Sequence, residues 1–294
     1  MEKVAQEINV CRHDAILVQF HQSVFKIEVS RGSLHVLVEY ADAQPSSQAA
    51  HAPVTAILGR MCGRMTMTLV NWSEVLRELK EILAAAGVDG LGADDEALSL
   101  YRPRYNIAPA QEHMVLRRFE GRARLCIGRW GLPVRGPGKA ASINVRAETV
   151  ASKPAFSEAF AHRRCVVPAD GFLEWKTGPE GRQPLWFHRP DGRLLLLAGL
   201  FDEEPPETKQ APRTRFAVLT TAANSMLAAF HSRMPVLLSP EEAATWLAEP
   251  DPRLLRAARD DLLVATPVSL RVNSIRHDDP ACLSPPRNVQ LSLF

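Results

Sequence analysis

Residues with reactive side chains occur in five short segments of the chain beyond residue 60. The segments are Met61–Arg64, Arg104–Pro109, Ile143–Thr149, Gly171–Trp175 and His231–Pro235. Cys62 supplies a thiol that is nucleophilic as the thiolate, while Glu174 and His231 can exchange protons. Taken singly, each has an ordinary explanation, as a core cysteine, a carboxylate on the wet face of a strand or a solvated histidine. Only the combination of segments indicates a function.

Asparagine and arginine side chains complete this set. Asn144, Arg146 and Glu148 alternate along the sequence, which places them on one face of a predicted strand. Beyond residue 60 the basic residues are mostly arginine, which binds phosphate through two parallel hydrogen bonds. This composition is compatible with phosphate contacts, but a GC-rich coding bias explains it more simply.

The five cysteines do not form a metal or disulfide pattern. Cys11, Cys62, Cys126, Cys165 and Cys282 are odd in number and contain no Cys-x-x-Cys pair, which favours a reducing compartment over a zinc ribbon or a secreted framework. Four of the nine histidines, His13, His21, His35 and His51, lie in the first sixty residues without metal-ligand spacing, and glycine-rich phosphate loops are absent. We therefore expect no metal and no cofactor.

The composition is that of an ordinary globular protein. The chain has 294 residues, 46% of them hydrophobic and 23% charged, and its net charge of +2 is too small to indicate a nucleic-acid partner by itself. No apolar run approaches 18 residues, and the N-terminus lacks the layout of a signal peptide. These features predict a cytoplasmic protein without a membrane contact.

The first sixty residues differ from the rest. Strands are predicted at Ala15–Phe20, Val24–Val29 and Leu34–Glu39, followed by a linker at Asp42–Pro53 that is rich in Ala, Ser, Gln and Pro. Because the segment ends in a linker, we expect residues 1–60 to be an extension that is poorly ordered or weakly structured.

Short strands with few helices are predicted beyond Met61. The strands are Met114–Arg118, Arg122–Arg129, Arg164–Pro168, Gly171–Lys176, Leu185–Arg189, Arg193–Leu200 and Arg215–Thr220. A hairpin turn at Glu120-Gly121 is expected to join the first two strands. Helices are expected to begin at Ser73, which caps a helix with one apolar face, at Asn224, and at a capping box formed by Ser239 and Glu242. A further helix is expected over Arg253–Arg259, with a loop at Val88–Pro103 and a polar turn at Arg104–Pro109. These elements indicate an α+β fold with an antiparallel, barrel-like or sandwiched sheet.

The five segments, in this order and with Arg129–Leu132, resemble the SRAP family, the SOS response-associated peptidases that process abasic sites in DNA. The resemblance covers Met61 to about Val289. It implies an α+β, SRAP-like fold in which antiparallel sheets form a distorted barrel with flanking helices. The expected divisions are an extension at 1–60, an SRAP domain at 61–289 and a C-terminal tail at 290–294.

The resemblance also implies a function in DNA repair. Such a protein crosslinks to abasic sites in single-stranded DNA and shields the lesion, through an N-terminal cysteine that forms a thiazolidine ring. Cys62 matches this nucleophile, and Asn144, Glu174 and His231 match the other catalytic residues. Matches to residues along the DNA path are Arg64, Trp130, Arg146 and Arg233, and Pro109 matches one that frames the cleft. Autoproteolytic peptidase activity and weak lyase activity are further implied.

Two features depart from the family. Cys62 is internal in this sequence, and an internal cysteine has an amide nitrogen in place of the amine that the ring requires. Either Met61 is the true start, or residues 1–60 are removed at the Met61–Cys62 bond, or they are a genuine N-terminal domain. In addition, Leu132–Gly138 is short and lacks a tryptophan often found there.

The last five residues, Gln-Leu-Ser-Leu-Phe, resemble the peptide by which bacterial replication and repair proteins bind the sliding clamp. Gln290, Leu291, Leu293 and Phe294 would make these contacts, although so short a match also arises by chance. We expect a monomer associated with the nucleoid. Two other functions stay open: an N-terminal-nucleophile peptidase acting on other proteins, and a clamp-tethered, non-catalytic binder of single-stranded DNA.

Overall fold

The architecture is described from a computed structural model of the whole chain. The structure describes residues 9–11, 15–20, 23–30, 33–39, 63–85, 90–93, 101–134, 140–178, 181–204 and 213–286. Contacts between residues divide the chain into two units, one of residues 1–57 and 287–294 and the other of residues 58–286.

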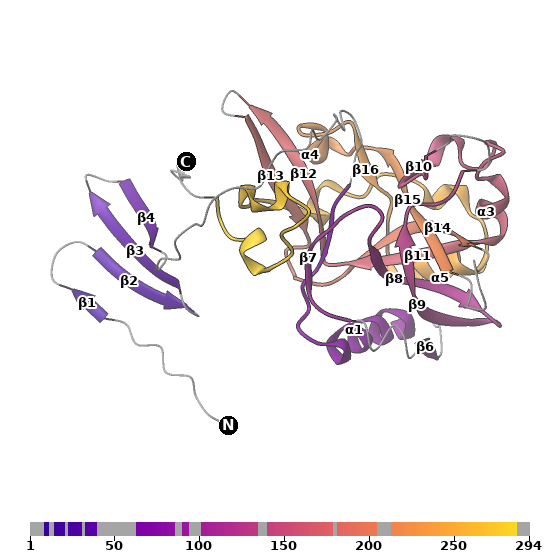
Figure 1. Cartoon of the computed structure of the whole chain (residues 1–294), viewed down its shortest axis with the longest axis horizontal. Coiled ribbons are helices and arrows are strands. Elements are labelled where there is room, and N and C mark those ends of the chain that lie inside the picture. The colour runs from indigo at the N-terminus through magenta and orange to yellow at the C-terminus, as the bar shows by residue number, and fades with distance from the viewer. Residues whose placement is uncertain are drawn as a thin grey trace. The chain divides into compact units, whose positions relative to one another are not determined.

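The described part of the N-terminal unit is an antiparallel sheet of four strands in sequence order (Figure 1). The strands are β1 (Asn9–Cys11), β2 (Ala15–Phe20), β3 (Ser23–Ser30) and β4 (Ser33–Glu39). The last three confirm predicted strands, and β1 was missed. The division at residue 60 and the weakly structured extension before it stay predictions.

A closed barrel of five strands forms the body of the larger unit (Figure 1). Its strands are β8 (Glu112–Phe119), β9 (Arg122–Trp130), β11 (Arg164–Ala169), β14 (Leu195–Glu204) and β15 (Arg213–Ala222). Antiparallel pairing runs in the order β9, β8, β11, β14, β15, and a parallel pairing of β15 with β9 closes the ring. This confirms the expected α+β fold with a distorted barrel.

Four short strands extend the barrel sheet: β6 (Leu91–Ala93), β10 (Asn144–Arg146), β16 (Arg233–Pro235) and β17 (Leu237–Leu238). β6 lies in the range expected to be a loop and pairs in parallel with β9. β10 also pairs in parallel, with β15, and places Asn144 opposite Val218. The sheet is therefore mixed, whereas the sequence predicts antiparallel pairing throughout.

A second, antiparallel sheet has five strands in the order β18, β13, β12, β5, β7. They are β18 (Val264–Pro267), β13 (Gly181–His188), β12 (Gly171–Gly178), β5 (Met65–Met67) and β7 (Arg104–Ile107). β7 corrects the expected polar turn at Arg104–Pro109. Its residues are extended because the adjacent strand β5 and a C-terminal segment satisfy their backbone groups.

The β8–β9 hairpin confirms a turn predicted from Glu120-Gly121. Phe119 pairs with Arg122, so two residues make the connection. Glu120 has φ 49° and Gly121 has φ 80°, the left-handed conformation at both central positions that a type I′ turn requires. Glycine adopts this conformation without a steric penalty.

The described helices are α1 (Trp72–Ala85), α3 (Ser157–His162), α4 (Ser225–Ala228) and α5 (Pro240–Ala248). Asn71, not Ser73, caps α1, because its Oδ1 accepts the Glu74 amide at 2.9 Å. Asn224 caps α4, and Ser239 with Glu242 forms the predicted capping box of α5.

Short 3₁₀ turns replace one predicted helix. The range Arg253–Arg259 contains only the end of η2 (Pro252–Leu254), and η3 (Asp260–Leu262) follows it. Three further turns are η1 (Ala147–Thr149), η4 (Leu270–Asn273) and η5 (Pro280–Cys282). The apolar face of α1 packs into the main core as its spacing predicts, with Val75, Leu79 and Leu83 buried.

Candidate active site

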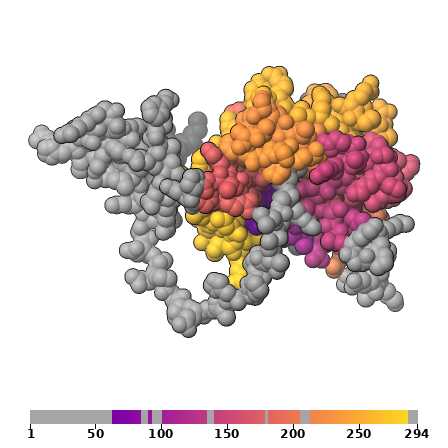
Figure 2. Space-filling model, turned by 90° about the horizontal axis from the view of Figure 1, so that it is seen from above, coloured from indigo at the N-terminus to yellow at the C-terminus, as the bar shows by residue number. Residues whose placement is uncertain are grey.

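Four of the seven described candidate residues line one cleft between two segments that are distant in sequence. Asn144 and Arg146 come from β10, and His231 and Arg233 come from the loop between α4 and β16 and from the start of β16. The cleft has a volume of about 480 Å³, and Ala140–Ile143, Thr220 and Ser232 complete its lining. Figure 2 shows the surface around α4, in orange, directly against the magenta surface of residues near 140–165.

Strand β10 is short, and this corrects one expectation. Asn144 and Arg146 share a face of β10 as predicted. Glu148 does not continue that face, because the chain turns into η1 at Ala147. It lies nevertheless beside Arg233, with which it forms an ion pair.

His231 has a fixed ring orientation. Its backbone amide donates to Leu227 O at 2.9 Å, which ties the residue to the end of α4. Its Nδ1 accepts a hydrogen bond from the Arg233 backbone amide at 3.0 Å. In the neutral imidazole the proton therefore lies on Nε2, which is the nitrogen left for a ligand.

The guanidinium of Arg233 is occupied by groups of the protein. Both terminal nitrogens bind the Glu148 carboxylate, one of them at 2.8 Å, and Nη2 also donates to Thr220 O at 2.5 Å. The hydrogen bond from Arg233 lowers the pKa of Glu148 below its usual range. Arg146, in contrast, is exposed at the cleft.

Trp130 is buried, with 1% of its surface exposed, and so has no surface to offer to DNA. The indole N–H donates to Ile143 O at 2.8 Å, and the ring stacks on Phe216 with centroids 6.2 Å apart. Because Ile143 precedes Asn144, this bond fixes the start of β10. Trp130 was expected to contact DNA, whereas in the structure it holds β10, the strand that carries Asn144, in place.

Glu174 lies on β12 of the second sheet, and Arg64 directly precedes the neighbouring strand β5. Glu174 is buried in β12, with 5% of its surface exposed. The Leu173 amide donates to Arg64 O at 3.1 Å and so continues the pairing of β12 with β5 toward Glu174. Cys62 lies outside the described residues, as do Gln290, Leu291, Leu293 and Phe294.

The Arg64 side chain points into a buried polar network. Nη1 donates to Asn106 Oδ1 at 2.8 Å and to Val272 O at 2.6 Å. Burial lowers the pKa of Arg64, and the guanidinium lies 5.7 Å from the centre of the Trp175 ring. Arg64 thus joins β5 to β7 and to η4 of the C-terminal segment.

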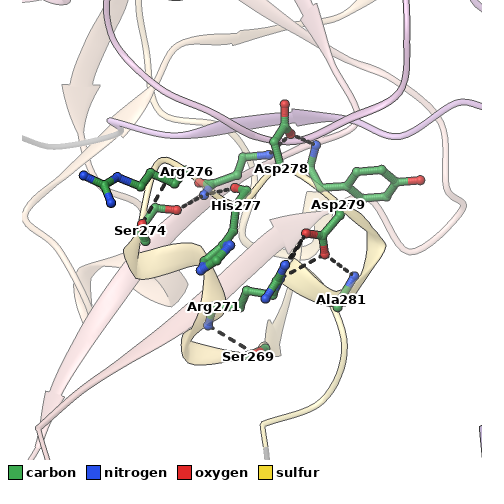
Figure 3. Close-up of polar contacts among 10 residues, drawn as sticks. Ser269, Arg271, Ser274, Arg276, His277, Asp278, Asp279 and Ala281 are labelled. Atoms are coloured by element: carbon green, nitrogen blue, oxygen red, sulfur yellow. Dashed lines mark hydrogen bonds and ion pairs between the residues drawn. The ribbon is translucent and has the colours of Figure 1, made fainter. Parts of the chain in front are cut away.

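Asn106 is the centre of this network and was not singled out from the sequence. It is fully buried, and its Nδ2 is within 3.2 Å of the carbonyls of Val272, Ser274 and His277. Asp278 adds a second tie, because its Oδ1 accepts the backbone amides of Tyr105 and Asn106 (Figure 3). The C-terminal segment is thereby fixed to β7.

An aromatic contact relates the two groups of candidate residues. Phe230, which precedes His231, meets Phe187 edge to face with centroids 5.6 Å apart. Phe187 stacks on Phe172 of β12, two residues before Glu174. Pro109 lies half-buried in the turn after β7, where Ala110 has φ 67°.

The described residues contain no cluster of three His, Cys, Asp or Glu side chains that could hold a metal ion. In the same part of the chain, no helix combines the length and apolarity needed to span a bilayer.

Comparison with known proteins assigns the chain to a family. Residues 61–275 match the family SOS response associated peptidase (SRAP), and the chain belongs to it. The abasic site processing protein YoqW of Bacillus subtilis is 32% identical over 232 residues, which cover 75% of this chain and 97% of YoqW. The abasic site processing protein HMCES of Gallus gallus is 31% identical over 226 residues, covering 63% of this chain and 67% of HMCES.

Solved structures agree with the fold. A protein from Bacteroides thetaiotaomicron superposes with a TM-score of 0.62 at 21% identity, covering 76% of this chain and 99% of its own. A phage-related protein from Bordetella bronchiseptica superposes with a TM-score of 0.54 at 27% identity, covering 70% and 94%.

Proposed function

We propose that this protein processes abasic sites in single-stranded DNA by forming a covalent bond to them through Cys62. The observation that carries the proposal is the cleft that gathers Asn144, Arg146 and His231 in a member of this family. The similarity to proteins named abasic site processing proteins supports the same substrate.

The proposed reaction uses both nucleophiles of an N-terminal cysteine. The α-amine, with a pKa of about 7.7–8.0, adds to the C1′ aldehyde of the open sugar, and loss of one water gives a Schiff base. The thiol then adds to the imine carbon, and its proton passes to the nitrogen. The product is a thiazolidine, formed with one water released and no change in oxidation state. Because both groups belong to one residue, ring closure is intramolecular and therefore fast.

The cleft residues have matching roles in this proposal. Asn144 orients the amine and the sugar through neutral hydrogen bonds, and Arg146 binds a flanking phosphate. His231, whose neutral form carries its proton on Nε2, donates and accepts protons during ring opening and Schiff-base formation. Trp130 and Arg233 act by holding the segments that carry Asn144 and His231.

Glu174 is the proposed acid toward the sugar ring oxygen. Arg64 is two residues from Cys62, and its carbonyl pairs with the residue that precedes Glu174. Only Gly63 separates Cys62 from Arg64 in the sequence, and in this proposal the amine therefore reacts beside Glu174. In this proposal Arg64 does not contact DNA as predicted; its hydrogen bond to Asn106 instead fixes the chain next to Cys62.

The amine must first be exposed. Either synthesis starts at Met61 and Met61 is removed, or the Met61–Cys62 bond is cleaved, autoproteolytically in keeping with the family name. The Schiff base also permits β-elimination and hence weak lyase activity. Binding of the Gln290–Phe294 tail to the sliding clamp would bring the protein to replication forks, and association with the nucleoid would follow from both contacts.

The proposal is tested by controlling when the amine appears. The residues just before Cys62 are replaced by the recognition sequence of a protease that leaves Cys62 as the first residue. Single-stranded DNA treated with uracil glycosylase is added before and after cleavage. We expect an adduct that survives denaturing gels only after cleavage, and none with Cys62→Ala. Absence of an adduct with the cleaved protein would overturn the proposal, and digestion of unrelated proteins would favour a peptidase.

A further inference from the structure

Arg233 connects the two segments that form the cleft. Its backbone amide donates to Nδ1 of His231, and its guanidinium binds Glu148 and the Thr220 carbonyl. Glu148 follows Arg146 by two residues, in the turn that ends β10. One side chain therefore ties the loop of His231 to the strand of Asn144 and Arg146.

This tie acts at a short strand next to His231. β16 has three residues, and its pairing with β15 sets Arg233 opposite Ala222 and Pro235 opposite Thr220. The peptide of Arg233 is the end of this short ladder and also the donor to the His231 ring. A shift of Arg233 therefore moves the ring.

Binding of DNA does not explain Glu148. Its side chain is 48% exposed and forms an ion pair with Arg233, whose hydrogen bond lowers the pKa of Glu148. A carboxylate close to the cleft that contains Arg146 opposes the approach of phosphate. The Arg233 guanidinium donates two hydrogen bonds to this carboxylate, and we therefore look for its contribution in that contact.

We infer that Glu148 is a positioning residue for the reaction at His231, acting through Arg233. The inference rests on the proposed function. Glu148 and Arg233 stay paired while DNA is bound, and the pair sets the orientation of the His231 ring; Arg146 is left as the cleft arginine that meets phosphate.

The chain offers a matched control. Glu203 pairs with Arg117, with side-chain exposures of 47% and 15%, while Glu148 and Arg233 have 48% and 18%. Glu203 lies on β14 and is not part of the cleft lining. Replacing either glutamate removes an equally exposed carboxylate from a similarly buried arginine.

The test separates chemistry from binding. Glu148→Ala, Glu148→Gln and Glu203→Ala are made in the full chain with the cleavable site before Cys62. Single-turnover adduct formation gives the rate at saturating protein. Affinity is measured with single-stranded DNA containing tetrahydrofuran, an abasic analogue without an aldehyde, and thermal unfolding is recorded for each variant.

We expect Glu148→Ala to lower the saturating rate by roughly tenfold to a hundredfold, because small displacements of a catalytic group cost this much. Affinity for the tetrahydrofuran DNA should stay equal or tighten by up to about fivefold, since a repelling charge is lost. Glu148→Gln keeps an acceptor for one guanidinium N–H and should restore part of the rate. Glu203→Ala should change neither quantity.

Three results would overturn the inference: an unchanged rate in both Glu148 variants, a rate loss matched by weaker DNA binding, or the same rate loss in Glu203→Ala. If Glu148→Ala unfolds at the assay temperature, Glu148→Gln carries the comparison. A wild-type protein that forms no adduct would instead contradict the proposed function.

Discussion

Asn106→Ala should destabilise the protein more than the replacement by alanine of any other asparagine or glutamine side chain that contacts the C-terminal segment. Asn106 is fully buried between β7 and the C-terminal segment. Its Nδ2 donates to backbone carbonyls of that segment, and its Oδ1 accepts from the Arg64 guanidinium at 2.8 Å. The substitution removes all of these bonds and leaves their partners buried.

The magnitude follows from the number and kind of bonds. Two neutral hydrogen bonds contribute about 1 kcal/mol each, and one to a charged donor about 2 kcal/mol. The free energy of unfolding should therefore fall by about 4 kcal/mol. Asn273 is the matched control, because its exposed side chain makes one hydrogen bond, from Trp175 Nε1 at 2.7 Å. Asn273→Ala should cost about 1 kcal/mol or less.

Urea unfolding of the full chain, followed by tryptophan fluorescence, measures both changes. Trp175 and Trp186 belong to the second sheet and report on its unfolding. A loss below about 1.5 kcal/mol for Asn106→Ala, which one ordinary hydrogen bond could explain, would refute the reasoning. An equal loss for Asn273→Ala would refute it as well.

Three further outcomes are expected. Burial lowers the pKa of His113 from 6.5 to about 4. As the pH falls, the unfolded chain binds the proton before the folded protein does, so the free energy of unfolding should drop by roughly 3 kcal/mol between pH 6.5 and 4. His113→Gln should flatten this drop in urea midpoints measured over the same pH range. Gly171→Ala should lower the free energy of unfolding by more than about 3 kcal/mol, because a Cβ there would lie 2.0 Å from Trp186 Nε1 and 2.9 Å from Phe187 O. Gly178→Ala is the control on the same strand: its Cβ would meet nothing closer than 3.9 Å, and the thermal midpoint should stay unchanged. Trp130→Phe removes the bond to Ile143 O and leaves a cavity at a buried residue. It should cost about 2–4 kcal/mol and slow adduct formation without weakening the binding of tetrahydrofuran DNA; weaker binding at an unchanged rate would contradict its role.

Local rules predicted the elements whose cause lies within a few residues. The Glu120-Gly121 hairpin and the capping box at Ser239 follow from backbone conformations that neighbouring residues impose. The cap of α1 was assigned to Ser73 instead of Asn71, because both residue types cap helices and the hydrogen bond alone distinguishes them.

Elements stabilised by distant partners were predicted less well. β7 was expected to be a turn, since nothing near Asn106 in sequence shows that Asp278 and the C-terminal carbonyls satisfy its polar groups. β6 was expected to be a loop, and its pairing with β9 is a tertiary contact. The helix predicted at Arg253–Arg259 is reduced to a 3₁₀ turn near Pro252.

The candidate site shows the same division. The five segments, recognised by family resemblance, named the residues of the cleft, and the structure brings Asn144, Arg146, His231 and Arg233 together. Which of them face a ligand depends on burial and pairing that sequence does not display. Trp130 and Arg233 were expected to contact DNA, whereas the structure engages both within the protein.

The mass of the adduct tests the central claim most directly. Protein cleaved so that Cys62 is its first residue is incubated with single-stranded DNA that carries one abasic site. The mass of the intact conjugate is then measured by mass spectrometry without a reducing agent. We predict a mass equal to that of protein plus DNA less one water. The crosslinked peptide should begin at Cys62, and Cys62→Ala should give no conjugate. A conjugate attached at another residue, or one formed equally well before the amine is exposed, would contradict it.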